Sequence, residues 1–295
     1  MIPTLNGATA GGGLALPEFA QLASQAGFVG IEYSIDEAAK LVEQTSFSNV
    51  AAIFESNRIL PAVFGLPVEW RQDEATFQNG LKHLPALAKL AQDLSTTRCT
   101  TWVLPADGSG ANLSRDEYAI QSIARFGQIG QVLADQGIRL GLEFIGPHHF
   151  RSEPERVWFY DIASGLDAVA KIEDAFQLEN IGLLVDSFHW HTSEATTMDL
   201  ASIPVEKIVH IHINDAPDVS VAAQLDGVRL LPGEGVIDLQ AFLQTLNAIG
   251  YDGPVAVETF SDDLRALPPH EAAARASQTT LGVLRRAGIE PLRLV

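Results

Sequence analysis

The chain has 295 residues, a single cysteine (Cys99) and a formal net charge of −18 at pH 7. No run of lysines and arginines offsets this charge, which disfavours binding to nucleic acids and to anionic membranes. The lone cysteine excludes an internal disulfide and a metal site built from cysteines. The sequence shows neither a signal peptide nor an apolar run of membrane-spanning length, so we expect a soluble cytoplasmic protein.

Eight short apolar segments follow one another along the chain and are predicted to be strands. Most are continuous apolar runs rather than alternating patterns, which is typical of parallel strands covered on both faces. In chain order they are 3–7, 30–33, 60–64, 100–104, 140–145, 181–185, 208–213 and 255–258.

Amphipathic segments between these strands are predicted to be helices, at 17–25, 36–55, 78–94, 116–136, 239–249 and 270–286. Three of them end one or two residues before a glycine, Gly137, Gly250 or Gly288, in keeping with the preference for glycine after a helix. The regular alternation predicts one α/β domain over residues 1–295, a single (β/α)₈ TIM barrel. An open, doubly wound sheet is disfavoured because the glycines at 11–13 lack the spacing of a dinucleotide-binding turn.

Ionisable residues stand at the ends of the last four predicted strands: Glu143, Asp186, His212 and Glu258. Taken alone, an acidic residue at a strand end is more often a helix cap or an ion-pair partner than a metal ligand, and a buried histidine is more often a core residue. In a barrel, however, these ends are neighbours on the active-site face. Three carboxylates meeting there would repel one another unless a cation lay between them. The pattern therefore predicts one divalent metal ion, with Mn²⁺ as the first expectation and Zn²⁺, Mg²⁺ or Co²⁺ as alternatives.

Motifs around these residues resemble the xylose-isomerase-like TIM-barrel superfamily, in its sugar phosphate isomerase/epimerase branch. The motifs are Gly141–Phe144, Val185–His189, His210–Asp215, Pro232–Gly235 and Val257–Glu258. The stretch from Gly182 to Thr259 is most similar to inosose (2-keto-myo-inositol) isomerases. The N-terminal half agrees with the superfamily only in its architecture.

The resemblance implies roles for individual residues. Glu143, Asp186, His212 and Glu258 would bind the metal, and Glu143 and Glu258 would also act as acid and base on opposite faces of the substrate. His189 and Arg229 would contact substrate oxygens. His149 stands where ketose 3-epimerases have a glutamate. We therefore expect His149 to contact the substrate, with either a different pattern of substrate hydroxyls or a different reaction outcome.

The expected activity is isomerisation or epimerisation of a small polyhydroxy carbonyl compound, a sugar or inosose, by proton transfer through an enediolate. The alternative is a dehydratase or lyase acting on a keto-sugar or a 3-dehydroshikimate-like compound at the same metal site. A DNA-repair nuclease of the endonuclease IV type is disfavoured by the eight histidines and the acidic charge. A binding module without catalysis is the remaining class, and a homo-oligomer stays open.

Other residues carry weaker expectations. His210 is predicted to be a buried, hydrogen-bonded core histidine, and Trp102 to pack in the core rather than stack on a sugar. His191 is as compatible with the site as with a solvated loop. The long loop 147–161 is interpreted either as a lid over the site or as a packing segment.

Overall fold

A computed structural model describes residues 1–294 and shows a closed barrel of eight parallel strands in the order β1 to β8. The strands are β1 (Ile2–Leu5), β2 (Gly30–Tyr33), β3 (Leu60–Gly65), β4 (Arg98–Val103), β5 (Arg139–Phe144), β6 (Ile181–Asp186), β7 (Ile208–Ile213) and β8 (Pro254–Val257). β1 pairs with β8 and closes the barrel. The predicted (β/α)₈ TIM barrel is confirmed.

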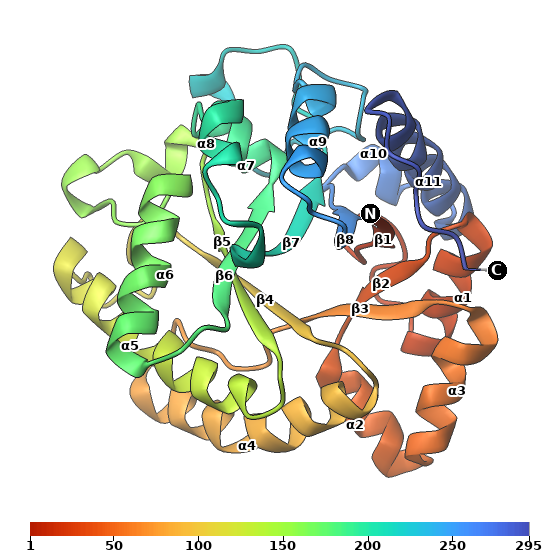
Figure 1. Cartoon of the computed structure of the whole chain (residues 1–295), viewed down its shortest axis with the longest axis horizontal. Coiled ribbons are helices and arrows are strands. Elements are labelled where there is room, and N and C mark those ends of the chain that lie inside the picture. Colours follow the sequence, from red (N-terminus) through yellow and green to blue (C-terminus); the bar gives the residue numbers. More distant parts are fainter. Residues whose placement is uncertain (295) are drawn as a thin grey trace.

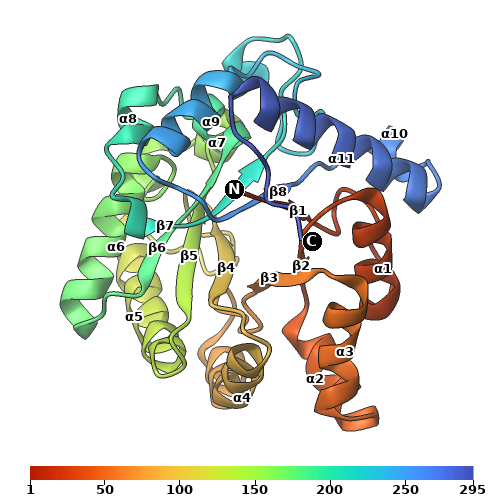
Figure 2. The same ribbon diagram turned by 45° about the vertical axis from the view of Figure 1, so that its right-hand side comes forward.

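Helices surround the barrel (Figures 1 and 2). They are α1 (Leu16–Ala26), α2 (Ile35–Gln44), α3 (Phe47–Asn57), α4 (Glu74–Asp93), α5 (Arg115–Ala134), α6 (Ile162–Phe176), α7 (Ser187–Thr192), α8 (Thr197–Ala201), α9 (Leu239–Ala248), α10 (Asp262–Arg265) and α11 (Pro269–Arg286). Among residues 1–294, no helix has the length and apolarity needed to cross a membrane.

The predicted helix at 36–55 is wrong as a single element, because the chain breaks it into α2 and α3. The Ser46 side chain accepts a hydrogen bond from the backbone N–H of Asn49 and so caps the start of α3. A serine in this position competes with helix continuation and favours a new N-terminus. Within residues 1–294, four helices have no counterpart among the predicted ones: α6, α7, α8 and α10.

The register between β6 and β7 decides which side chains face the barrel interior. It shifts between Leu183 and Leu184, so that Ile208 pairs with Leu183 but His210 pairs with Leu184. Beyond this irregularity His212 lies opposite Asp186. Without the shift, Ile211 would take that position and His212 would face the other side of the sheet.

Candidate metal centre

The ends of four consecutive strands bring the four predicted ligands together. Glu143 lies near the end of β5, Asp186 ends β6, His212 lies near the end of β7, and Glu258 directly follows β8. One potential ligand atom from each lies within 4.8 Å of the others. The Nδ1 atom of His212 is 3.3 Å from Glu258 Oε2, 3.5 Å from Glu143 Oε1 and 3.8 Å from Asp186 Oδ2.

Two atoms in this group have unmet bonding capacity. Glu143 Oε1 and His212 Nδ1 are buried and have no hydrogen-bond partner within residues 1–294. Leaving buried polar atoms unpaired is costly, and bonds to a cation would satisfy both. Three carboxylates and one imidazole also form a donor set that suits a divalent metal ion. The residues present therefore fit a divalent metal.

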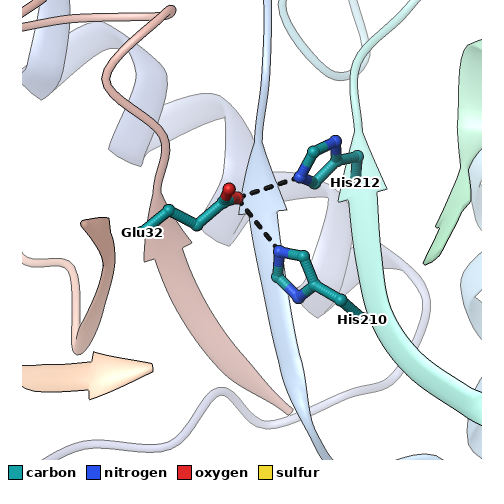
Figure 3. A group of neighbouring side chains, drawn as sticks. All are labelled: Glu32, His210 and His212. Carbon is teal, nitrogen blue, oxygen red and sulfur yellow. Dashed lines mark hydrogen bonds and ion pairs between the residues drawn. The ribbon is translucent and has the colours of Figure 1, made fainter. Parts of the chain in front are cut away.

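Glu32 also lies in this region, beside His210 and His212 (Figure 3), and it was not among the predicted site residues. Its Oε1 atom lies 2.9 Å from His212 Nε2 and 3.0 Å from His210 Nε2. Its Oε2 atom accepts a hydrogen bond from the Asn6 amide, which also donates to Glu258 Oε1. The only signal for Glu32 was a single acidic residue inside a short apolar strand.

This arrangement orients His212. With Nε2 directed at Glu32, the Nδ1 atom faces the three other carboxylates. Metal-binding histidines commonly hydrogen-bond a carboxylate through their second nitrogen in this way. His210 is fully buried and hydrogen-bonded to the same Glu32 oxygen, which confirms the prediction made for it.

Arg229 reaches the group from the loop after β7. Its Nη1 atom donates to Asp186 Oδ2 at 3.0 Å and to Glu258 Oε2 at 2.8 Å. Its Nη2 atom donates to Asp226 Oδ1 at 2.7 Å. Buried Asp215 folds this loop back. Its carboxylate accepts hydrogen bonds from the backbone N–H groups of Gly233 and Ile237.

His189 also lies beside the group, whereas His149 does not. His189 is fully buried on α7, with Nε2 3.7 Å from Glu143 Oε1. The Asp186 carboxylate caps α7 by accepting the backbone N–H groups of Phe188 and His189, so it also positions this imidazole. His149 is exposed and its ring packs against Phe150, with no hydrogen bond or ion pair to the group within residues 1–294.

The electrostatic environments of the two proposed acid/base residues differ. Burial raises the pKa of Glu143 to about 7, and the nearby carboxylates of Glu258 and Asp186 add to the rise, although His212 opposes it. Burial also favours a higher pKa for Glu258. There, however, His212 and Arg229 outweigh burial and lower the pKa to about 2. Both histidine and arginine favour the ionised form of Glu258.

The remaining expectations have mixed outcomes. The loop 147–161 contains two short 3₁₀ turns, and its Trp158 and Phe159 are buried, with Trp158 packed edge-on against Tyr118. His191 is half-buried on α7. The predicted core position of Trp102 is wrong, since 43 % of this residue is exposed. Trp102 pairs in register with Glu143, which turns it toward the barrel mouth rather than the helical layer.

The amino-acid sequence is similar to those of known proteins. The family model described as xylose isomerase-like TIM barrel matches residues 20–286. An inosose isomerase from Halalkalibacterium halodurans is 24 % identical over 252 residues, which cover 85 % of this chain and 84 % of the relative. A 3-dehydroshikimate dehydratase from Pseudomonas aeruginosa is 31 % identical over 156 residues, covering 52 % and 23 % of the two chains.

Solved structures share the fold. A xylose isomerase domain protein from Alicyclobacillus acidocaldarius superposes with a TM-score of 0.86 at 30 % identity, covering 98 % of this chain and 99 % of that one. The IOLI protein, solved with a zinc atom bound, superposes with a TM-score of 0.79 at 23 % identity and covers 97 % and 99 %. Because the family model matches most of the length of this chain, the chain belongs to the xylose isomerase-like TIM barrel family.

Proposed function

We propose that this protein is a divalent-metal-dependent isomerase or epimerase of a sugar or inosose, acting by proton transfer next to a carbonyl group. The observation that carries the proposal is the pair of carboxylates, Glu143 and Glu258, which lie 3.5 Å and 3.3 Å from His212 Nδ1. They come from β5 and β8, the two outer strands of the four that form the group. A substrate held between them would meet one carboxylate on each face.

Each residue has a role that follows from its contacts. Asp186 and His212 would complete the metal site with the two glutamates, for which Mn²⁺ is our first candidate. A bound divalent ion would hold the carbonyl and adjacent hydroxyl oxygens and stabilise negative charge on them. One glutamate removes the proton from the carbon beside the carbonyl and a glutamate returns one. Return to the same carbon from the opposite face is epimerisation. Return to the former carbonyl carbon, together with transfer of the hydroxyl proton to the former carbonyl oxygen, is isomerisation.

Arg229 and His189 would orient the substrate. Both border the carboxylate group, and both are buried, so their polar hydrogens have little competition from water. Arg229 is held at a second point by Asp226, which limits its rotamers before substrate arrives. A preorganised guanidinium loses less entropy when it binds a ligand oxygen.

A second candidate function is a dehydratase. The similarity to a 3-dehydroshikimate dehydratase over 156 residues favours it. Proton removal by the same carboxylate would then be followed by loss of a hydroxyl group from the next carbon, so the two functions diverge after the first step.

The test incubates the Mn²⁺-loaded protein with a panel of ketoses, inososes and 3-dehydroshikimate in deuterated water, followed by NMR and mass spectrometry. An isomerase or epimerase gives product of unchanged mass apart from deuterium at the carbon beside the carbonyl. A dehydratase gives product that has lost water. On an active substrate, Glu258→Gln is expected to lower the rate at least about 100-fold, because an amide cannot accept the proton. Near-normal turnover in both Glu143→Gln and Glu258→Gln would overturn the proposal.

A further inference from the structure

A cavity of about 870 Å³ opens at the barrel mouth between the loops that follow β3 and β4. We call it the Trp102 cavity, and its lining includes Glu69, Arg71, Trp102, Ser109 and Gln121. None of the four candidate metal ligands lines it. Its volume lies toward the upper end of the roughly 300–1,000 Å³ of small-molecule sites, which leaves space beyond the reacting centre for more than a single small ring.

The cavity adjoins the candidate metal centre through Trp102. Trp102 on β4 is the register partner of Glu143 on β5. Paired residues on neighbouring strands lie about 5 Å apart and point to the same face. Trp102 therefore places one wall of the cavity one strand away from Glu143.

The charged side chains that line the cavity already have partners. Arg71 forms an ion pair with Glu69 at 3.0 Å, and Arg125 forms one with Glu74 at 3.0 Å. Asp73 caps α4 by accepting the backbone N–H of Thr76. With three acidic and two basic lining residues, the cavity offers no surplus positive charge for a phosphate or carboxylate. A neutral ligand fits it better.

The remaining surface of the cavity combines an aromatic ring with polar groups. The Arg71 guanidinium lies over the Trp102 ring at 4.1 Å, yet 43 % of Trp102 is still exposed. Gln121 projects from α5 with no side-chain hydrogen bond to residues 1–294, so both ends of its amide are open to a ligand. An aromatic surface offers contact to apolar C–H groups, and amide and guanidinium groups offer hydrogen bonds to hydroxyls.

From this position, volume and chemistry, we propose that the Trp102 cavity binds the second ring of a glycoside, so that the substrate is a disaccharide-sized keto-sugar rather than a monosaccharide. The inference rests on the proposed function for the reacting ring. The second ring is expected to contact Trp102, Arg71 and Gln121.

Binding without turnover tests this inference separately from catalysis. The probes are methyl cellobioside and methyl maltoside, with methyl glucoside as the single-ring comparison; all three lack a free carbonyl. Trp102 is a built-in reporter, because Trp70, Trp158 and Trp190 are only 2 %, 6 % and 7 % exposed. We expect at least one two-ring glycoside to protect Trp102 fluorescence from acrylamide quenching and to bind at least about tenfold more tightly than methyl glucoside by calorimetry.

Gln121→Ala and Arg71→Ala are expected to abolish most of this two-ring advantage. Gln128→Ala is the matched control, since Gln128 is a half-buried glutamine on the same helix that does not line the cavity. Equal affinity for one-ring and two-ring probes would overturn the inference. It would also be overturned if Gln121→Ala and Arg71→Ala kept the two-ring advantage as Gln128→Ala does. Exchange on a ketose without any two-ring advantage would leave the proposed function standing and remove only this inference. Tighter binding of the two-ring probes without deuterium exchange on any keto-glycoside would leave this inference standing and remove the proposed function.

Discussion

At the scale of single residues, the candidate metal centre depends on partners that do not themselves face the centre. Glu32 contacts two histidines through one oxygen, and Asn6 links Glu32 to Glu258. Such partners fix the orientation of a ligand before the ion arrives. The contacts join residues up to 252 positions apart in the chain, so the barrel has to close before they form.

Glu32→Gln is expected to weaken metal binding about 10- to 100-fold, because the amide carries no charge to hold the Nε2–H of His212. The measurement is a titration of the metal-free protein with Co²⁺, followed by its absorption spectrum. Glu173→Gln is the control, since Glu173 has similar exposure but pairs with Lys207 on the outside of the barrel. Unchanged Co²⁺ affinity in Glu32→Gln would contradict the positioning role.

The stability of the metal-free protein is expected to depend on pH through Glu143. The folded protein keeps a proton on this carboxyl up to about pH 7, while the unfolded chain releases it near 4.5. The folded state therefore binds more protons in this window, and the free energy of unfolding falls as the pH rises from 4.5 to about 7. Urea unfolding of Glu143→Gln should show a smaller fall.

Glu258→Gln separates this effect from a general loss of carboxylates. The lowered pKa of Glu258 contributes stability above pH 4.5 that is lost as the pH falls toward 2. This variant should therefore change the acid side of the profile and leave the fall between pH 4.5 and about 7 in place. Identical profiles for the wild type and Glu143→Gln would show that Glu143 does not hold a proton in the folded state.

At the scale of elements, the pairing of β6 with β7 sets the geometry of the centre. Gly182 on β6 packs closely at the start of this pairing, where an added Cβ atom would overlap the backbone oxygen of Lys207 and contact Val209. The glycine therefore lets the two strands approach where their register shifts. A side chain here has to push apart the strands that carry Asp186 and His212.

Gly182→Ala is expected to lower the free energy of unfolding by about 1–3 kcal/mol, because the overlap involves backbone that cannot rotate away. Gly65→Ala is the control: this glycine ends β3, and nothing lies within 4 Å of an added Cβ atom there. Its effect should stay within about 0.5 kcal/mol. Denaturant unfolding measures both, and a neutral Gly182→Ala would mean that the strands can separate at no cost.

At the scale of the whole molecule, the candidate ligands come from four separate strands that make up half of the barrel. An ion bound to all four would connect elements that are far apart in the chain. Binding of such an ion only by the folded state adds stability in proportion to the logarithm of its concentration. Metal binding and unfolding should therefore be linked.

Adding Mn²⁺ at about 100 times its dissociation constant is expected to stabilise the metal-free protein by about 2.7 kcal/mol. His212→Ala should lose this gain, because it removes a ligand. His189→Ala should keep the gain while lowering kcat or raising KM on an active substrate, because it would remove a substrate contact. Thermal unfolding with and without Mn²⁺ measures the difference, and equal loss of the gain in both variants would contradict the separate roles.

The sequence by itself determined the strand–helix alternation and the placement of four ionisable residues at strand ends. These features are local, because burial on both faces requires apolar runs and a strand end is visible as the last residue of such a run. The position of Arg229 beside the site was reached only through its resemblance to a known motif, since nothing in its own spacing points to the centre. Helix caps such as Ser46 are also local signals, and here the signal was missed.

Only the tertiary structure decided which side chains face one another. The shift in register between β6 and β7 turns His212 toward Asp186, and the pairing of β4 with β5 turns Trp102 toward the barrel mouth beside Glu143. Glu32 meets His212 across 180 residues of chain. Because a strand presents alternate residues to opposite faces, a change of one residue in register reverses every assignment. That choice is made by packing between strands distant in sequence, which leaves no trace in any one of them.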